Sequence, residues 1–485
     1  MKKLLKKLIP DFILYWYHWK LAFLGAVVFG WPSRKLKVIG VTGTKGKSTV
    51  VFLAGKILQE KFSTSSNNTN PPQPFLKGGG EESNSPPLGG VRGDFVTKVG
   101  WISSLTINDG KRKYMNPFHM TMPGRFFIQQ TLRRMVKNGC KYALVEVTSE
   151  GIKQHRHRFI KWAGAVFTNL APEHLEAHGG FENYRKEKEK LFAAVARNKK
   201  SFGIYNLDDK NAEWFLKYPV GKKFGYFLNP PQPSFKKEGD AFLYKREAGR
   251  DFEISDVKLG ADGSGFKLNG VDFKTNLLGE FNVYNCAAAA AIGEACGVKL
   301  EDASVALGKI QAIPGRLEII DEGQDFSVVV DLAHTPDSFE KVFKLFNELR
   351  NQPHPNPLLE KERQKIGRII SVFGSAGGGR DKWKRPELGK IASQYSNQIF
   401  ICNEDPYDED PLSIAEQILA GSDKNKTDIV LGRREAIAKA LSLARTGDII
   451  LVLGKGTEQT YVEGTKKIHW DDREVAREEL KKIKK

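Results

Sequence analysis

KVIGVTGTKGKSTVVFLAGKILQEK, from Lys37 to Lys61, is the most informative stretch of this chain. The β-branched run Lys37–Thr42 predicts a buried strand, and Ser48–Lys61 predicts a helix. Between them lies GTKGKST, a glycine-rich turn whose backbone amides, together with the start of the helix, suit phosphate oxygens. The strict P-loop pattern has one more glycine, at the position of Val41. A tight turn without nucleotide is the alternative, but the strand–turn–helix context favours phosphate binding.

The loop predicts ATP and Mg²⁺ as cofactors. In such a loop the lysine bridges the β and γ phosphates, which is the role of Lys47, and the Ser48 hydroxyl is a ligand of Mg²⁺. The loop residues expected to bind ATP are Gly43, Thr44, Lys45, Gly46, Lys47, Ser48 and Thr49. A kinase or a simple NTPase would use the same loop, so the loop by itself predicts only ATP use.

Strands and helices continue to alternate along the rest of the chain, which predicts an α/β protein with parallel sheets. The expected strands are 142–147, 165–168, 327–331, 368–373, 398–402, 428–431 and 448–453, and expected helices include 181–197 and 282–296. We expect a basic and aromatic segment over 1–36, a central P-loop ATPase domain over 37–313 and a C-terminal Rossmann-like domain over 314–485. Three proline-rich stretches are predicted surface insertions without catalytic role: 70–94, 229–233 and 352–365.

The composition is that of a globular protein with a basic balance. The 485 residues carry a formal net charge of +19. This charge suits anionic substrates, an anionic membrane or nucleic acid, and equally a chain with many solvated lysines. Nucleic acid ranks last because no zinc-finger spacing or RNP-like aromatic pattern occurs. No CxxC pair occurs either, which predicts reduced, buried thiols of a cytoplasmic protein at Cys140, Cys286, Cys296 and Cys402.

The N-terminal segment combines lysines with aromatic side chains. Residues 1–7 carry four lysines, and residues 12–31 are apolar and aromatic, interrupted by His18 and Lys20. A spanning helix needs about 20 mostly apolar residues, whereas Trp and Tyr beside lysines are typical of a helix at a membrane interface. A signal peptide is weaker, because no small-residue cleavage site follows. An interfacial helix at the inner face of the membrane, a helix docked on its own protein and a true span all stay open.

Further motifs follow the phosphate loop. They are EVTSEG (146–151), FTNLAPEHLEAHG (167–179), YRKEKEKLF (184–192), GEFNVYN (279–285), GRLE (315–318), DLAHTPDS (331–338), FGSAGGGRD (373–381), GKGTE (454–458) and DDREVA (471–476). In this order they resemble the Mur ligase family, from about Lys37 to the end of the chain. The resemblance implies an ATP-dependent ligase of peptidoglycan synthesis, which activates a carboxylate as an acyl phosphate and joins it to an amine. It is closest to the branch that adds the third amino acid to a UDP-N-acetylmuramoyl-dipeptide.

The resemblance also implies catalytic and metal-binding residues. The implied catalytic residues are Lys47, Glu146, His174 and Lys188, and the implied metal ligands are Ser48, Glu146, His174 and a carbamylated Lys188. Carbamylation would turn the lysine ammonium into a carboxylate-like ligand. The run KEKEK is otherwise typical of a solvated helix face, which is our interpretation of Lys186 and Lys190.

The resemblance further implies residues that contact ATP and residues that contact the substrates. Beyond the loop, ATP is expected at Asn282, Asn285, Arg316 and Asp331. Substrate contacts are expected at Thr121, Thr148, Gln154, Arg156, His334, Arg380, Asp405, Gly454 and Glu458. Of these, Gln154 and Arg156 match positions that hold the UDP-muramoyl substrate. Arg380 would meet the carboxylate of the incoming amino acid, and Glu458 its amine.

Some positions depart from the family. Glu150 stands where a histidine is usual, and Thr148 stands for a serine and keeps its hydroxyl. Residues 404–407 are EDPY where the diaminopimelate-adding branch has DNPR, so lysine or another amino acid becomes an open alternative. Fewer than forty residues precede the first strand, where the family has a uridine-binding domain, so UDP recognition is open as well.

Three alternatives remain beside a monomeric, cytoplasmic ligase of this branch. One is another ligase of the superfamily, either folylpolyglutamate synthetase-like or a MurT-like amidating subunit. The segments HTPDS (334–338) and DDREVA favour the muramoyl branch instead. Another is a non-catalytic, membrane-associated nucleotide-binding partner protein, which hydrolysis dependent on an added amino acid would exclude. Nucleic-acid binding is the third and predicts a steep salt dependence.

Overall fold

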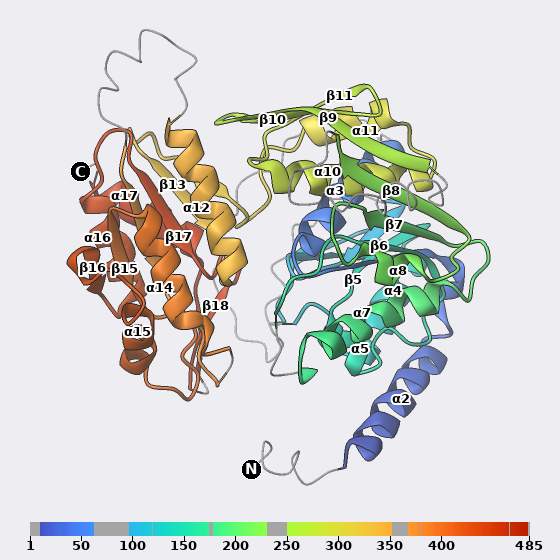
Figure 1. The fold of residues 1–485 in the computed structure, drawn as a ribbon. Helices are drawn as coiled ribbons and strands as arrows, with labels where there is room; N and C mark the ends of the chain where they lie inside the picture. Colours follow the sequence, from blue (N-terminus) through green and yellow to red (C-terminus); the bar gives the residue numbers. More distant parts are fainter. Residues whose placement is uncertain are drawn as a thin grey trace.

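The computed structural model describes residues 10–62, 97–118, 120–173, 178–229, 250–351, 367–379, 381–464 and 466–483. The predicted insertions 70–94 and 352–365 lie outside these residues, as do 230–233, His174 and Arg380. Figure 1 shows two α/β units side by side, with the C-terminal unit coloured orange to red. Helix α2 (Asp11–Val28) extends from the lower end of the larger unit.

An eleven-stranded sheet forms the larger unit, in the order β11-β10-β9-β8-β7-β6-β1-β5-β2-β3-β4. The central strands β9, β8, β7, β6, β1, β5 and β2 run parallel to one another. At the two ends of the sheet, β10 and β11 pair antiparallel beside β9, and β3 and β4 pair antiparallel beside β2. The strands are β1 (Lys37–Thr42), β2 (Val99–Ile102), β3 (Thr106–Asn108), β4 (Lys113–Met115), β5 (Tyr142–Glu146), β6 (Trp162–Phe167), β7 (Phe202–Asn206), β8 (Lys222–Leu228), β9 (Arg250–Gly260), β10 (Gly263–Leu268) and β11 (Val271–Thr275).

Helices cover both faces of this sheet, which explains why its central strands are apolar throughout. The helices are α3 (Lys47–Phe62), α10 (Glu280–Ala295) and α11 (Leu300–Gly308) on one face, and α4 (Arg125–Lys137), α7 (Phe181–Val195) and α8 (Ala212–Leu216) on the other, with α5 (Ser149–Lys153) beside α7. The fully buried alanine run 287–291 lets α10 pack closely against α3, as Figure 1 also shows.

The C-terminal unit is built on a six-stranded sheet in the order β12-β13-β17-β14-β15-β16, parallel except for β12. Its strands are β12 (Glu318–Ile320), β13 (Ser327–Asp331), β14 (Ile369–Phe373), β15 (Gln398–Ile401), β16 (Thr427–Ile429) and β17 (Ile449–Leu453), and β18 (Thr460–Glu463) pairs separately with β19 (Lys466–His469). Helices α12 (Pro336–Asn351), α14 (Lys384–Tyr395) and α15 (Pro411–Leu419) pack on one face, and α16 (Arg433–Ser442) and α17 (Asp472–Ile483) on the other. Short 3-10 helices occur at η1 (Pro32–Lys35) and η3 (Lys424–Lys426).

The predicted α/β fold class with parallel sheets is confirmed. The first strand and 327–331 have the predicted bounds, and the other predicted strands and helices differ at their ends by one to three residues. The antiparallel ends of the large sheet, β3–β4 and β10–β11, were not expected from the alternation of strands and helices. The large sheet lies within 37–313 and the smaller one within 314–485, and the limits of the domains stay a prediction.

The four cysteines have the predicted surroundings. All are buried and unpaired. Burial raises the pKa of the Cys140, Cys286 and Cys296 thiols to about 12, and that of Cys402 to about 11. They are therefore protonated and inert at neutral pH.

Helix α2 docks on its own protein through small residues. Ala22 and Ala26 are buried, and Gly25 lies against the start of α4. In the part of the chain that the structure describes, no helix combines the length and apolar character needed to cross a membrane.

Candidate active site

The phosphate loop lies at the carboxyl edge of the large sheet, between the ends of two neighbouring strands. β1 pairs with β5 so that Val41 is opposite Glu146, and with β6 so that Thr42 is opposite Phe167. Parallel strands present their carboxyl ends at one edge of a sheet, which is where ligands bind in such folds. The topology therefore brings the predicted Glu146 and the segment that follows Phe167 to the loop.

Gly43 is required by the close approach of that second segment. Its φ is +148°, and a Cβ here would lie 2.0 Å from the Thr168 hydroxyl. Thr168 Oγ1 donates to the Lys45 carbonyl at 2.7 Å, and the Thr44 amide donates to the Asn169 carbonyl at 2.8 Å. These contacts fix the loop, and only glycine fits at its first position.

Lys47 and two asparagines of α10 contact the backbone of the phosphate loop or lie next to it. Lys47 Nζ donates to the Thr44 carbonyl at 2.7 Å, and burial lowers its pKa despite the nearby carboxylates. A Cβ on Gly46 would lie 2.4 Å from Asn285 Oδ1, and Asn285 Nδ2 donates to Asn282 Oδ1 at 3.0 Å. The predicted nucleotide residues of α3 and α10 thus lie together.

Glu146 is joined to Ser48 through a residue that the sequence did not indicate. The buried Glu146 carboxylate accepts the Ser104 amide at 2.7 Å, and the Ser104 hydroxyl is 2.7 Å from the Ser48 hydroxyl. Ser104 follows β2, and this strand was not predicted, so its position beside Glu146 could not be anticipated.

Lys188 differs from its neighbours in the KEKEK run. Lys186 and Lys190 are exposed, whereas Lys188 is 1% exposed and its Nζ donates to the Gly43 carbonyl at 2.7 Å. Burial, and then the Lys47 ammonium, lower the pKa of Lys188 well below its usual value. This environment favours the neutral amine, which is the form that reacts with CO₂ to give a carbamate.

The side chains at the loop supply some of the oxygen ligands that Mg²⁺ needs, but not a complete set. Among the described residues, no group of three or more His, Cys, Asp or Glu side chains could hold a metal ion. Ser48 and Glu146 offer hard oxygen atoms, and Mg²⁺ completes its shell with water and substrate phosphates more often than with protein groups. An unmodified Lys188 offers no oxygen, whereas its carbamate would. The donor set thus fits Mg²⁺ shared with ATP, and the predicted ligand His174 lies outside the described residues.

The two units meet beside the loop. Glu173 Oε1 is 2.8 Å from Lys45 Nζ and 3.7 Å from Nε2 of His334, which belongs to the C-terminal unit. Burial, and next the Lys45 charge, lower the pKa of His334 well below its usual value, so the imidazole is neutral. Lys384 Nζ donates to the His334 carbonyl at 2.9 Å. A set of charged groups therefore spans the junction between the units.

Asp331 ends β13 and organises the start of the C-terminal unit. Its carboxylate accepts the Leu317 amide at 2.9 Å and the Ala333 amide at 2.7 Å. Burial raises the pKa of Asp331, although Arg316 nearby opposes this. Arg316 also lowers the pKa of Lys47, so it is close enough for its charge to be felt at the phosphate loop.

A second charged cluster lies at the carboxyl edge of the smaller sheet. Lys455 Nζ, which is completely buried, lies 2.9 Å from Asp405 Oδ1 and 3.1 Å from Glu458 Oε2. Burial raises the pKa of Glu404 and of Glu458. Glu404 Oε2 has no hydrogen-bond partner among the described residues, and a Cβ on Gly454 would lie 2.6 Å from it. This oxygen is therefore buried and without a hydrogen-bond partner among the described residues, which is uncommon for a polar atom.

Tyr407 occupies the place of the arginine in DNPR. Its ring lies 3.5 Å from where a Cβ on Gly378 would stand, and its carbonyl accepts the Gly464 amide at 2.7 Å. The residue that follows Gly379, the predicted Arg380, lies outside the described residues.

The predicted muramoyl contacts form a third group. Thr148 caps α5 by accepting the Gly151 amide at 3.1 Å. Gln154 Nε2 donates to Glu150 Oε1 at 2.6 Å, and Arg156 Nη2 donates to Gln154 Oε1 at 2.6 Å. Glu150, the departure from the family histidine, thus orients Gln154. Arg156 also contacts the carbonyl of Met122, next to the half-buried Thr121.

Several residues of these groups were missed at first. They are Ser104, Glu173, Lys384, Glu404, Lys455 and Tyr184, whose hydroxyl lies 3.1 Å from the Thr44 hydroxyl. All but Ser104 lie in or beside stretches quoted above, so the sequence indicated their neighbourhood. Their contacts could not be predicted, because they depend on how distant segments of the chain pack together.

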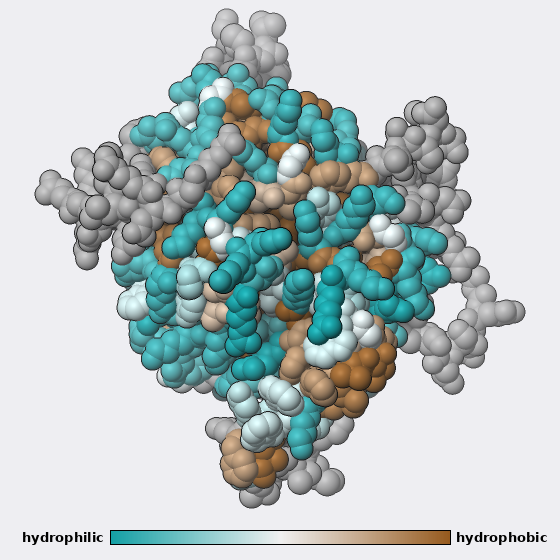
Figure 2. Space-filling view, turned by 90° about the vertical axis from the view of Figure 1, so that its right-hand side faces the viewer, coloured by the Kyte–Doolittle hydropathy of each residue, from teal (hydrophilic) through white to brown (hydrophobic). Residues whose placement is uncertain are grey.

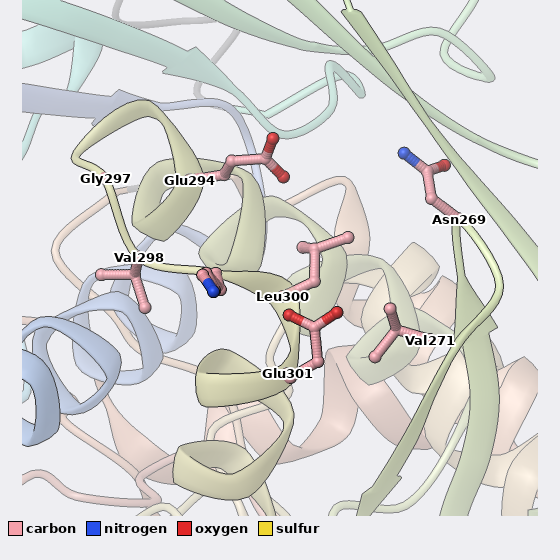
Figure 3. A pocket seen from close by; sticks show the side chains of 8 residues that line it. Asn269, Val271, Glu294, Gly297, Val298, Leu300 and Glu301 are labelled. Atoms are coloured by element: carbon pink, nitrogen blue, oxygen red, sulfur yellow. The ribbon is translucent and has the colours of Figure 1, made fainter.

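A cavity of about 430 Å³ lies elsewhere, where α10 meets α11 and the β10–β11 hairpin (Figure 3). Its side chains come from Asn269, Val271, Glu294, Val298, Lys299, Leu300 and Glu301. None of the predicted site residues lines it, so it is separate from the phosphate loop.

Two family models match this chain. Residues 95–293 match the Mur ligase middle domain, and residues 315–456 match the Mur ligase glutamate ligase domain. The UDP-N-acetylmuramyl-tripeptide synthetase of Borreliella afzelii (strain PKo) is 35% identical over 471 residues, which cover 95% of this chain and 80% of that protein. The UDP-N-acetylmuramoyl-L-alanyl-D-glutamate–2,6-diaminopimelate ligase of Syntrophomonas wolfei is 31% identical over 468 residues, which cover 95% of this chain and 81% of that protein.

Solved structures share the fold. A UDP-N-acetylmuramoyl-L-alanyl-D-glutamate–2,6-diaminopimelate ligase aligns with a TM-score of 0.53 and 24% identity, over 93% of this chain and 79% of that one. The Mycobacterium tuberculosis folylpolyglutamate synthase complexed with ADP aligns with a TM-score of 0.62 and 13% identity, over 90% of this chain and 92% of that one.

Proposed function

Because this chain belongs to the Mur ligase family of ATP-dependent ligases, we propose that it adds the third amino acid to a UDP-N-acetylmuramoyl-dipeptide in peptidoglycan synthesis. The observation that carries the proposal is the burial of Lys188 against the phosphate loop, 2.7 Å from the Gly43 carbonyl. Carbamylation of this lysine would add a second carboxylate-like group near Glu146, whose charge acts on Lys188, and such a group suits a Mg²⁺ ion shared with ATP.

The first step forms the acyl phosphate. The substrate carboxylate attacks the γ phosphorus of ATP, and ADP leaves. Lys47 and the loop amides stabilise the charge that develops on the phosphate oxygens, and Arg316 adds charge from the C-terminal unit. Ser48, Glu146, His174 and a carbamylated Lys188 would hold Mg²⁺, which supplies charge neutralisation at the same oxygens when bound.

The second step forms the amide bond. The neutral amine of the incoming amino acid attacks the acyl carbon, the tetrahedral intermediate expels phosphate, and the nitrogen loses one proton to the departing phosphate. Glu458 and Asp405 hold the amine in this proposal, with Lys455 between them fixing their positions. His334 and Arg380 contact the substrates from the same unit, and closure of the two units excludes water.

The acceptor is the least determined part of the proposal. Tyr407 replaces the arginine of DNPR, which removes the group expected to meet a second carboxylate. Four carboxyl groups act on one another here, those of Glu404, Asp405, Glu458 and Asp472, against three cations, Lys384, Lys455 and Arg433, so the cluster has one carboxyl group more than it has cations. An amino acid with a cationic side chain, lysine first, suits this balance better than diaminopimelate.

Phosphate release tests the function. The purified protein is given ATP, Mg²⁺ and one amino acid at a time, with UDP-N-acetylmuramoyl-dipeptide present or absent. We expect release only when the dipeptide and a suitable amino acid are both present. Release with a folate and glutamate instead would favour the folylpolyglutamate branch, and ATP binding without turnover would favour a non-catalytic partner.

The proposed enzyme is a cytoplasmic monomer. Contact of its N-terminal segment with the inner face of the membrane stays a prediction from the sequence. Helix α2 is the part of this segment that the structure describes.

A further inference from the structure

Helix α2 presents a broad apolar face to solvent. Exposed side chains on it include Phe12, Trp16, Tyr17, Leu24, Val27 and Val28, with Phe12 66% and Val28 60% exposed. At about 100° per residue these side chains fall on one continuous arc, about 160° wide. Figure 2 shows apolar residues gathered at the lower part of this face of the molecule, where α2 lies in Figure 1.

The opposite side of the helix is already used by the protein. Ala22 and Ala26 are buried, Tyr15 packs edge-on against His155 with ring centroids 4.4 Å apart, and Trp19 does the same against Phe159 at 5.2 Å. A helix that is apolar on all sides is normally covered on all sides. The docking therefore explains one face of α2 and leaves the other without a partner among the residues that the structure describes.

The sequence that contains α2 is strongly basic. Residues 1–36 contain seven basic residues and one acidic residue, Asp11. Lys20 is exposed within the apolar arc, and Arg34 and Lys35 are exposed just beyond the helix. The Arg34 guanidinium also lies 4.7 Å from the centre of the Trp31 ring. Aromatic and aliphatic side chains flanked by lysine and arginine complement the headgroups and upper acyl region of an anionic bilayer.

We infer that the exposed face of α2 is a docking surface for an anionic lipid bilayer. The helix lies flat in the interface, with its apolar arc in the lipid and its basic residues at the headgroups. Charge complementarity favours lipid over a second copy of the chain, because two copies would bring the same positive groups together.

Docking would place one substrate segment at the bilayer. His18 of α2 contacts Arg125, and Arg125 Nε donates to the Gln154 carbonyl at 3.0 Å. Gln154 and Arg156 are the predicted muramoyl contacts. Arg125 therefore joins α2 to the part of the enzyme proposed to hold the larger substrate, although lipid binding itself does not depend on the ligase proposal.

Vesicle co-sedimentation of the full chain, without ATP or substrate, tests the inference. We expect sedimentation with phosphatidylcholine vesicles that contain phosphatidylglycerol, less at high salt, and little with phosphatidylcholine alone. The variant Trp16→Gln, Leu24→Gln, Val28→Gln should partition at least about tenfold more weakly. The variant Lys20→Gln, Lys35→Gln should lose about fivefold for each lysine. Circular dichroism spectra and a Tm equal to those of the unmodified protein would show that these variants are folded.

A matched control changes three exposed apolar residues on other elements: Val305→Gln, Leu443→Gln and Ile468→Gln. It should sediment as the unmodified protein does. Failure of the unmodified protein to bind anionic vesicles overturns the inference, and so does equal binding by the α2 variant. A dimer in sedimentation velocity that the α2 variant dissociates, without vesicle binding, would overturn it in favour of a second copy.

Discussion

Lys188 shows how burial, rather than residue type, selects a lysine for chemistry. Three lysines alternate in one helix, and only the central one points into the protein. Burial and the nearby Lys47 charge lower the pKa of its amine, which lies 2.7 Å from the Gly43 carbonyl of the phosphate loop. The sequence placed Lys188 through a resemblance alone, because residue spacing cannot separate it from Lys186 or Lys190.

Replacing this side chain should abolish ligation without unfolding the protein. We expect Lys188→Ala to lose about 100-fold or more in the rate of phosphate release. The substitution removes the lysine that would carry the charged carbamate beside the transferring phosphate. Short carboxylic acids such as acetate should restore part of the rate by occupying the place of the carbamate. The exposed neighbour gives the control, Lys190→Ala, which should keep its activity. Full activity of unrescued Lys188→Ala would rule out the carbamate.

Burial of Lys188 also predicts a pH-dependent cost to stability. Its folded pKa is lowered, so between that value and the usual value of about 10.4 the unfolded chain binds a proton that the folded chain does not. The cost is fully present below the folded pKa and disappears as the pH rises toward the unfolded one. In CO₂-free buffer, the stability advantage of Lys188→Met over the unmodified protein should therefore shrink between about pH 7 and about pH 10. Urea unfolding at each pH measures the free energy of unfolding of both proteins. A difference between them that does not change with pH would contradict a lowered pKa of Lys188.

At the scale of elements, the strand–loop–helix unit around Gly43 needs a glycine for two reasons. The backbone has a positive φ, and the Thr168 hydroxyl occupies the space of a Cβ. Gly43→Ala should cost about 2 kcal/mol or more in the free energy of unfolding and should also abolish nucleotide binding. Gly270, with φ +82° and open space around it, is the matched control. Gly270→Ala should cost about 1 kcal/mol and leave nucleotide binding unchanged, so similar effects of the two variants would contradict the crowding at Gly43.

The elements that the sequence predicted are those with long apolar periodicity. The strand 37–42 and the helix that follows it were predicted because both are buried and bounded by a glycine-rich turn. The strands β2, β3 and β4 have only three or four residues, and their pairing depends on neighbours far along the chain. Ser104 follows the first of them, so its place between Ser48 and Glu146 could not be predicted.

At the scale of the whole molecule, two units share one site through charged side chains. Glu173 of the larger unit lies between Lys45 and His334, and Arg316 influences Lys47 from the other unit. Motifs predicted which residues belong to each unit. They could not predict this junction, because it depends on how two separately folded sheets are placed.

A nucleotide held by both units should stabilise the whole chain. A non-hydrolysable ATP analogue with Mg²⁺, at about 100 times its Kd, should add about 2.7 kcal/mol to the free energy of unfolding. For a chain of this size the Tm should rise by about 3 °C. Differential scanning calorimetry should show no rise for Lys47→Ala and a normal rise for Lys56→Ala, which lies further along the same helix. An unchanged rise in Lys47→Ala would contradict the assigned loop.

The most direct measurement is the mass of the product. The protein is incubated with ATP, Mg²⁺, UDP-N-acetylmuramoyl-dipeptide and lysine, and the mixture is analysed by liquid chromatography and mass spectrometry. We predict a UDP-muramoyl-tripeptide heavier than the dipeptide by one lysine residue, formed together with equal amounts of ADP and phosphate. ADP and phosphate without any amide product, with lysine or any other amino acid, would contradict the ligase.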